Sequence, residues 1–505
     1  MNLSAPTLLL RADANPRIGE GHVMRVMTLA EDWIRIGGGV VLLSHELPAK
    51  LTERAEQLGI RCVALTANPG SEADRVETSE MILRIDPLWL VIDGYDLHTL
   101  IPQSREEGFP EVLAFDDFSI GRVIRADLVV DQNAGTIRES YKDYSPKTKL
   151  LLGGSYCLIR GEFRRAHKES EHVASSVERV LVTFGGADPS NATTDCIRAF
   201  SHVTENKLRI DVVVGATNPR RAEVEDAAAE SPHEVVLLDG VSNMAELMSH
   251  ADLAIAGPGV TCWELAYIGV PMLLVTLAEN QQPNAEYLER TGVARCLGDH
   301  ATTSESDWQE SIQTVLEDAD LRAGMVENGR QLIDGLGTAR VCRHLRESLF
   351  RLRAAESADA RMIWEWSNEP ETRKASFSSD LIPWETHVSW FEKRLADQDC
   401  QIYLASNNDG IALGQVRFET TGAEATISIS LDADARGHGW GTQLIWMACR
   451  RFFSKTEVDR IEALIKPDNG ASIRAFEKAE FVSAGGTEVK QQPARRFVLD
   501  RGKCL

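Results

Sequence analysis

The sequence predicts two doubly wound, Rossmann-like α/β halves followed by a smaller α+β domain. Short Val/Ile/Leu runs alternate with segments of helical periodicity up to about residue 345, and this alternation restarts once, near residue 176. After about residue 349, strands of alternating polarity replace it, which is typical of an α+β arrangement. A chain of 505 residues is long enough for about three domains. We therefore expect domains at residues 1–165, 176–345 and 348–505.

Continuous apolar runs predict the strands of the two halves, because a parallel sheet is covered by helices on both faces. One helix is expected over residues 22–36, and the glycines at 37–39 end it. The expected strands of the first half are Thr7–Arg11, Val40–Ser44, Trp89–Asp93, Val112–Phe115 and Leu128–Val130. Those of the second half are Arg179–Phe184, Ile210–Val214, Val235–Leu238, Leu253–Ala256 and Met272–Val275.

The third domain has a different pattern. Residues 351–355 and a tryptophan-rich helical stretch precede alternating strands at residues 401–406, 411–419 and 425–431. A further strand is expected at residues 460–465. This order of elements predicts a sheet with helices packed against it.

Composition excludes several classes of function. The net charge of −22 gives no basic face for nucleic acid, so phosphate-bearing ligands must be held locally by backbone amides and a few cations. The nine cysteines are odd in number and lack a Cys-x-x-Cys pair, so neither a metal site nor a disulfide framework is expected. The start of the chain does not resemble a signal peptide, and no apolar run reaches the roughly 18 residues of a membrane span. We expect a cytoplasmic protein without membrane partners; its oligomeric state stays open.

A glycine loop after the first predicted strand ends in a histidine. Gly19, Gly21 and His22 lie between this strand and the first helix. Glycines let the backbone approach a ligand, and a helix N-terminus attracts anions. A histidine at the positive end of a helix is expected to favour its neutral form, as a general base near neutral pH requires. The alternative is an ordinary capping or packing histidine.

The second half contains two more glycine turns between a strand and a helix. Gly185 and Gly186 follow one strand, and Gly257 and Gly259 follow another. Glu264, inside the next helix, is placed to accept the hydroxyls of a ribose, as acidic residues do in dinucleotide sites. The alternative for Glu264 is a solvated helix residue.

These motifs together resemble the UDP-sugar hydrolases of the pseudaminic acid pathway, which cleave UDP-2,4-diacetamido-2,4,6-trideoxy-β-L-altrose. That family is similar in fold to the two-domain, glycosyltransferase-B-like enzymes. The resemblance implies that His22 activates water, that Tyr95 lies in the sugar pocket, and that Arg160, Glu264 and Asn280 contact the UDP-sugar. The matching stretches are RADANPRIGEGHVMR, VIDGYDL, VLAFDD, ADLVVDQN, LLGGSYCLIRGEF, VTFGGADPSN, GPGVTCWELAYIGVP and AENQQPNA.

A second glycine loop follows the strand that ends at Leu431. It reads Arg436-Gly437-His438-Gly439-Trp440-Gly441 and opens a helix, so that consecutive N–H groups can surround a pyrophosphate. With the later segment that contains Asn469 and Ser472, residues 349–490 resemble the GCN5-related N-acetyltransferases. The resemblance implies acetyl-CoA as co-substrate, with the glycine loop on its pyrophosphate and Asn469 on its pantetheine arm. The alternative is a dinucleotide loop of another kind, although no βαβ unit follows.

Two features of this domain bear on its activity. Phe476 stands where the acetyltransferase family usually has the tyrosine that protonates the departing thiolate, so water or Ser472 would have to replace it. The general base is not identified; Glu419 and Glu424 are candidates by strand position. The stretch IWEWSNEPETRKASF…HVSWFEKRL resembles the acetyltransferases of UDP-linked 4-amino sugars, and its tryptophans at 364, 366 and 390 either stack on the substrate or belong to the core.

The leading hypothesis is therefore a bifunctional enzyme that N-acetylates a UDP-4-amino sugar and then removes UDP. Two alternatives stay open. The first part is a glycosyltransferase fused to an unrelated acetyltransferase, or one of the two parts is catalytically degenerate and serves only in binding.

Overall fold

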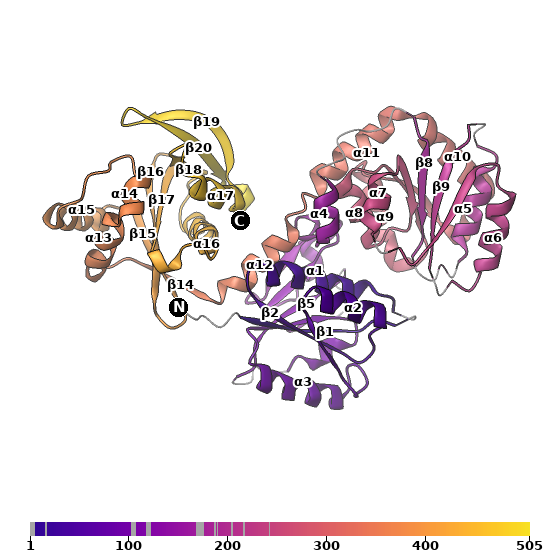
Figure 1. The fold of residues 1–505 in the computed structure, drawn as a ribbon, viewed down its shortest axis with the longest axis horizontal. Helices are drawn as coiled ribbons and strands as arrows, with labels where there is room; N and C mark the ends of the chain where they lie inside the picture. Colours follow the sequence, from indigo (N-terminus) through magenta and orange to yellow (C-terminus); the bar gives the residue numbers. More distant parts are fainter. Residues whose placement is uncertain are drawn as a thin grey trace. The chain divides into compact units, whose positions relative to one another are not determined.

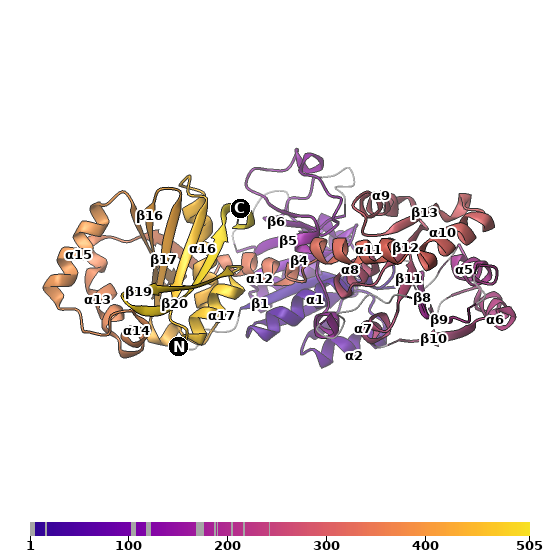
Figure 2. The same ribbon diagram turned by 90° about the horizontal axis from the view of Figure 1, so that it is seen from above.

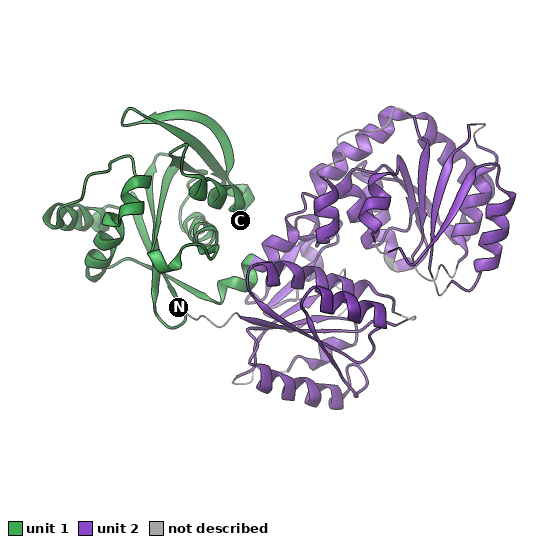
Figure 3. Cartoon of the chain, viewed as in Figure 1, with its two compact units in different colours: residues 1–3, 343–505 green, residues 4–342 purple. Residues whose placement is uncertain are grey.

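The computed structural model describes residues 6–15, 18–102, 108–117, 123–167, 176–185, 188, 190–203, 206–215, 218–241 and 243–504. The chain divides into two compact units, one covering residues 4–342 and the other residues 343–505 (Figure 3). Within the described residues, three sheets are formed, two in the first unit and one in the second. No helix of this described part is both long and apolar enough to cross a membrane.

The first sheet is parallel and has the strand order β3-β2-β1-β4-β5-β6-β7. Figure 1 shows α1 and α2 on one face and α3 on the other. Its strands are β1 (Thr7–Ala12), β2 (Gly39–Ser44), β3 (Arg61–Ala64), β4 (Trp89–Asp93), β5 (Glu111–Phe115), β6 (Leu128–Asp131) and β7 (Lys149–Leu152). The helices are α1 (Gly21–Arg35), α2 (Ala49–Gln57), α3 (Glu72–Ile85) and α4 (Gly161–Ala166).

The second sheet is also parallel, with the order β10-β9-β8-β11-β12-β13. In Figure 1, α5, α6 and α10 cover one face, and α7, α8 and α9 the other. The strands are β8 (Arg179–Thr183), β9 (Arg209–Val214), β10 (Glu234–Asp239), β11 (Leu253–Ala256), β12 (Met272–Thr276) and β13 (Arg295–Asp299). The helices are α5 (Ala192–Phe200), α6 (Arg221–Glu230), α7 (Met244–Ser249), α8 (Val260–Ile268), α9 (Gln282–Arg290), α10 (Glu305–Glu317), α11 (Ala319–Leu332) and α12 (Gly337–Glu347).

The third sheet has the order β14-β15-β16-β17-β18-β20-β19 and is antiparallel except for the pair β17–β18. Figures 1 and 2 both show α13 and α15 on one side of it and α16 and α17 on the other. The strands are β14 (Phe350–Ala354), β15 (Cys400–Asn407), β16 (Ala412–Thr421), β17 (Glu424–Leu431), β18 (Arg460–Ile465), β19 (Val482–Val489) and β20 (Gln492–Asp500). The helices are α13 (Ala360–Asn368), α14 (Pro370–Ala375), α15 (Trp384–Ala396), α16 (Trp440–Phe453), α17 (Gly470–Lys478) and α18 (Arg501–Cys504).

The predicted fold class is confirmed: two doubly wound α/β halves precede an α+β domain. In the first sheet the order reverses between β1 and β4, since their loops lead to strands on opposite sides. The register pairs Ala12 with Asp93, so the two strands end together at this switch point. Ligands of open α/β sheets bind in the crevice beyond the strand ends at such a point. The fold therefore places the first glycine loop beside the end of β4.

Candidate active sites

A histidine–aspartate pair lies at the switch point of the first sheet. His22, in the first turn of α1, has Nδ1 2.7 Å from Oδ1 of Asp93, the last residue of β4. Asp93 is 1% exposed, whereas the His22 side chain is 12% exposed. Because an ionised carboxylate only accepts hydrogen bonds, Nδ1 carries the proton and Nε2 is left as the acceptor. An imidazole held in this way can take a proton from a bound water.

The structure corrects one prediction about His22. Its place in the first turn of a helix suggested a lowered pKa, but the pKa of His22 is raised. Burial acts to lower this pKa, and the charge of Asp93 and its hydrogen bond outweigh burial. Asp93 stays ionised, because the charges of Arg25 and His22 overcome its burial and lower its pKa to about 2. A nearby full charge therefore decides the proton affinity of His22, rather than the helix dipole.

Tyr95 and Gly21 lie beside this pair. The Tyr95 ring meets the His22 ring edge to face, with 5.2 Å between their centroids, and Tyr95 is 40% exposed. Gly21 opens α1, and a β-carbon there would meet nothing within 4 Å. The structure thus brings together the three residues that the sequence places in the first part of the site.

Arg160 and Glu264 form a bidentate ion pair. Arg160 Nε donates to Glu264 Oε1 at 2.6 Å, and Nη2 donates to Oε2 at 2.8 Å. Glu264 on α8 is 3% exposed, and burial raises its pKa although Arg160 acts against this. Each carboxylate oxygen has a second lone pair, so this ion pair leaves acceptor capacity for a ligand hydroxyl. Glu264 is not the solvated helix residue of the alternative reading.

The two glycine turns of the second half differ at the helix that follows each. After Gly185, the Asp188 carboxylate accepts hydrogen bonds from the N–H groups of Ala192 and Thr193, at 3.1 and 2.9 Å, and so caps α5. The start of α5 already carries a negative charge, which opposes a phosphate there. Gly186 and the side chain of Asn280 lie outside the residues that the structure describes.

The N-terminus of α8 has no such cap. Gly259 stands at its N-cap position without a side-chain hydrogen bond, and a β-carbon on Gly259 would meet nothing within 4 Å. Free N–H groups beside open space are what an anionic ligand needs. Of the two turns, the one at residues 257–259 is therefore the better place for a diphosphate.

The glycine loop of the second unit has a similar opening. Gly437 and Gly439 have φ angles of +82° and +72°, in the left-handed region where glycine is favoured. A β-carbon on Gly437 would meet nothing within 4 Å, and one on Gly439 would meet Arg346 Nη1 at 4.0 Å. α16 follows without a side-chain cap. This loop can surround a pyrophosphate with backbone N–H groups.

The strand before this loop separates from its neighbour. The parallel pairing of β17 with β18 covers Glu424–Ile427 and then ends, although β17 continues to Leu431. Apart from the Leu431 carbonyl, the backbone groups of residues 428–431 on that side have no partner in β18 and can meet the amide groups of an extended ligand such as the pantetheine arm. Arg436 does not face this opening with its full guanidinium, since Nη2 donates to the Leu431 carbonyl at 2.9 Å and to Glu369 Oε2 at 2.6 Å.

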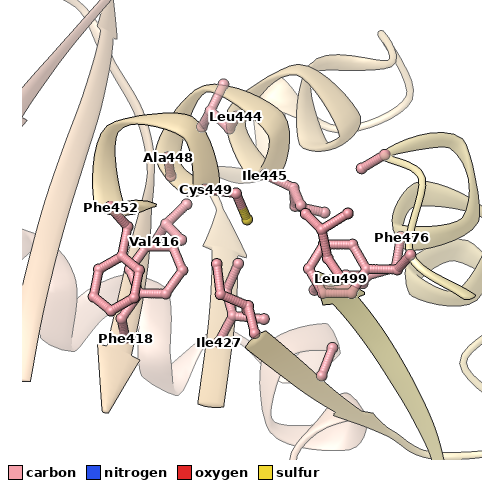
Figure 4. Close-up of a cluster of buried hydrophobic side chains, with 14 of the residues drawn as sticks. Val416, Phe418, Ile427, Leu444, Ile445, Ala448, Cys449, Phe452, Phe476 and Leu499 are labelled. Carbon is pink, nitrogen blue, oxygen red and sulfur yellow. The ribbon is translucent and has the colours of Figure 1, made fainter. Parts of the chain in front are cut away.

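The remaining acetyltransferase residues have structural contacts of their own. Asn469 caps α17, its Oδ1 accepting from the Ser472 N–H at 3.1 Å. Phe476 is 3% exposed and lies in the core with its ring edge to face with Phe481, at 4.9 Å between centroids. Figure 4 shows Phe476 beside Leu499 in this cluster.

The candidate bases and tryptophans are mostly engaged elsewhere. Glu419 pairs with Arg417 at 3.0 Å, and Glu424 lies at the turn between β16 and β17, at the opposite end of β17 from the glycine loop. Trp366 is 7% exposed and donates to Asp432 at 2.8 Å, which supports its core reading. Within the described part of the chain, no group of three His, Cys, Asp or Glu side chains is arranged to hold a metal ion.

Two protein-family profiles match the chain, one within each of its two compact units. The profile of the glycosyltransferase family 28 C-terminal domain matches residues 180–331, and that of the acetyltransferase (GNAT) domain matches residues 350–482. The chain thus joins an α/β unit that is similar to glycosyltransferase family 28 over residues 180–331 to a domain that is similar to the GNAT acetyltransferases over residues 350–482.

Individual relatives cover both parts. An uncharacterised protein of Methanocaldococcus jannaschii is 24% identical over 412 residues, which are 80% of this chain and 81% of the relative. The spore coat polysaccharide biosynthesis protein SpsG of Bacillus subtilis is 25% identical, over 65% of this chain and 95% of its own. The UDP-2,4-diacetamido-2,4,6-trideoxy-beta-L-altropyranose hydrolase of Campylobacter jejuni is 23% identical, over 56% of this chain and 97% of its own. Among solved structures, aminoglycoside acetyltransferase AAC(6')-Ib is 24% identical and covers 30% of this chain and 95% of its own, with a TM-score of 0.28.

Sequence reasoning missed the partners of His22. Asp93 was expected only as the end of a strand, and neither Arg25 on α1 nor Asp117 after β5 was singled out. A signal was present, because aspartates directly follow the apolar runs of β4 and β5. Parallel strands that are neighbours end at one edge, so such aspartates meet.

Proposed function

We propose that the chain is a bifunctional nucleotide-sugar enzyme of pseudaminic acid biosynthesis. Its second unit transfers an acetyl group from acetyl-CoA to the amine of a UDP-4-amino-4,6-dideoxy sugar. Its first unit then hydrolyses the resulting UDP-2,4-diacetamido-2,4,6-trideoxy sugar to free sugar and UDP. The enzyme works in the cytoplasm. The observation that carries the hydrolase proposal is the hydrogen-bonded His22–Asp93 pair at the switch point.

In the proposed hydrolysis, His22 Nε2 takes a proton from water as the water oxygen attacks the anomeric carbon. The bond from that carbon to the diphosphate oxygen breaks, and UDP leaves with the electron pair. Asp93 stabilises the imidazolium that forms. The uncapped N-terminus of α8 holds the diphosphate, and Arg160 with Glu264 holds the nucleotide sugar. UDP is a good leaving group, so a positioned water and a stabilised diphosphate are the main requirements.

In the proposed acetyl transfer, the loop at Gly437–Gly441 holds the pyrophosphate of acetyl-CoA and the opening between β17 and β18 receives the pantetheine arm. The acceptor amine attacks the thioester carbonyl, the bond from that carbon to sulfur breaks, and the proton that the amine loses ends on the departing thiolate, which gives an amide and free CoA. The GNAT match and the backbone geometry of the loop support this assignment.

The test is mass spectrometry of the products formed by purified protein from acetyl-CoA and UDP-4-amino-4,6-dideoxy-N-acetyl-altrosamine. We expect an acetylated UDP-sugar, then stoichiometric UDP and free sugar without any added acceptor. The glycosyltransferase alternative is favoured by the family 28 match and predicts UDP release only when a sugar acceptor is supplied. Absence of UDP without acceptor, in a reaction where the acetylated UDP-sugar has formed, overturns the hydrolase proposal. Absence of the acetylated sugar identifies a degenerate acetyltransferase.

A further inference from the structure

A second layer of charge lies behind the His22–Asp93 pair. Arg25, one turn further along α1, donates to Asp93 with Nε and Nη2, both at 2.7 Å. Its Nη1 donates to Asp117 Oδ1 at 2.9 Å. Arg25 is 8% exposed, and the side chain of Asp117 is 23% exposed. One buried guanidinium is thus shared between carboxylates at the ends of two neighbouring strands.

The balance of positive and negative charge in this cluster affects how strongly Asp93 acts on His22. A guanidinium that paired with Asp93 alone would neutralise the carboxylate that His22 depends on. Asp117 supplies a second negative charge, so the three groups behind His22 carry a net charge of about −1 when both carboxylates are ionised. The charged and titratable groups that face His22 in the described structure are Arg25, Asp93, Asp117 and Tyr95. Among the charges acting on His22, Arg25 lowers its pKa, and Asp93 and Asp117 raise it.

Asp117 is itself held by Asn133, which is in turn bonded to the second half of the unit. Its Oδ1 accepts from Asn133 Nδ2 at 3.2 Å, and this amide also donates to Asp131 at 2.8 Å. Asn133 Oδ1 accepts in turn from Nδ2 of Asn284 on α9, at 3.0 Å. Asn284 is 5% exposed, and its Nδ2 lies 3.4 Å from the Pro258 carbonyl in the loop before α8. A bonded chain thus fixes the position of Asp117.

We propose that Asp117 is a positioning residue for the candidate base: it shares the Arg25 guanidinium with Asp93, which leaves the Asp93 carboxylate able to orient His22. This role rests on the proposed hydrolase function. Asp117 acts through Arg25 and Asp93 and takes no part in bond making. Its contribution is a second carboxylate for Arg25, which neither His22 nor Asp93 supplies.

The decisive variant is Asp117→Asn, which removes the charge and keeps the shape. Histidine ring signals of the full chain are followed by NMR against pH, and His22→Asn identifies the His22 signal among the 12 histidines. We expect the pKa of His22 to fall by roughly half a unit to one unit, the lower end of the effect of a nearby charge. Asp117→Glu retains the charge and should restore the titration. In hydrolysis assays, the acid limb of kcat/KM should move to lower pH by the same amount.

Asp116→Asn is the matched control. Asp116 is the preceding residue, 8% exposed, and it accepts from Tyr144 at 3.2 Å rather than from Arg25. Neutralising it should leave the His22 titration within 0.2 units of wild type, a shift of roughly this size being about 0.3 kcal/mol. If Asp117→Asn does not fold, Asp117→Ser removes the same charge with a smaller side chain. An unchanged titration in a folded, uncharged variant overturns the proposal, and so does an equal shift in the control. Lack of UDP release by wild type overturns the hydrolase function instead, because the titration needs no turnover.

Discussion

Gly439→Ala tests the pyrophosphate loop with a single methyl group. The φ angle of Gly439 is +72°, and its added β-carbon would meet the protein only at Arg346 Nη1, 4.0 Å away. The folding cost is therefore backbone strain without a clash, about 1–2 kcal/mol for an L-residue in the left-handed region. For a domain of this size, that lowers Tm by about 2–8 °C.

The effect on binding should be larger. The methyl group points into the open space that the loop offers to a pyrophosphate. Loss of one hydrogen bond to a charged phosphate oxygen costs about 1.5–3 kcal/mol. This corresponds to an increase of about 10- to 150-fold in the Kd for CoA.

The assay is calorimetric titration with CoA, together with a thermal scan of the same sample. Gly422→Ala is the matched control, because Gly422 has a φ angle of +63°, lies in the turn between β16 and β17, and would also place its β-carbon in open space. Both variants should lose similar stability, and only Gly439→Ala should lose CoA affinity. If folded Gly439→Ala binds CoA within about twofold of wild type, roughly 0.4 kcal/mol, the loop does not hold the pyrophosphate.

Four further outcomes are expected. His22→Asn should abolish UDP release and leave acetyl transfer unchanged; residual hydrolysis within about threefold of wild type, roughly 0.65 kcal/mol, would exclude His22 as the base. Asp93 raises the pKa of His22, and the base acts in its neutral form, so kcat/KM for hydrolysis should fall as pH drops through a value above 6.5. Asp93→Asn should move this acid limb of the pH profile to lower pH. An acid limb that stays in place in Asp93→Asn contradicts the role of Asp93. Arg160→Met leaves the Glu264 carboxylate buried alone and should lower the free energy of unfolding of the first unit by about 3–5 kcal/mol in denaturant titrations. Adding Glu264→Leu should restore this stability. A loss of unfolding free energy below about 1 kcal/mol would show that solvent reaches Glu264. Phe476→Tyr should lower the free energy of unfolding by about 1–3 kcal/mol without raising kcat, because the hydroxyl enters an apolar core. An increase of about tenfold or more in kcat would instead show that protonation of the thiolate limits acetylation.

In the two parallel sheets, the strands that the sequence missed are less buried than most of those that it predicted. The predicted edge strand β10 is the exception, and in the third sheet β19 and β20 were missed as well. The central strands β1, β4, β11 and β12 each contain an uninterrupted apolar run, since each is covered on both faces. β3, β7 and β13 were not predicted, and all three are edge strands with partly exposed residues. An edge strand faces solvent along one side, so its sequence does not need an unbroken apolar run.

At the two candidate active sites, the local sequence was enough to indicate the glycine loops, whereas the proton affinity of His22 depends on the tertiary structure. Glycine turns between a strand and a helix are local features, so His22 and the loop at Gly437–Gly441 could be found from the sequence. The raised pKa of His22 could not, because it depends on Asp93, which is 71 positions away and meets His22 only through the β1–β4 register.

The two glycine turns of the second half and the Arg160–Glu264 ion pair also show what only the tertiary structure reveals. The stretches at Gly185 and Gly259 look alike in sequence, and only the folded chain shows that Asp188 caps the helix after the first and that the second is uncapped. Likewise, Arg160 and Glu264 are 104 positions apart, and packing alone makes them a buried pair. Sequence by itself thus determined the order of elements and the loops, because backbone periodicity and glycine conformation are local. Tertiary structure determined the proton affinities and the usable helix ends, because Coulomb interactions act between side chains that only folding brings together.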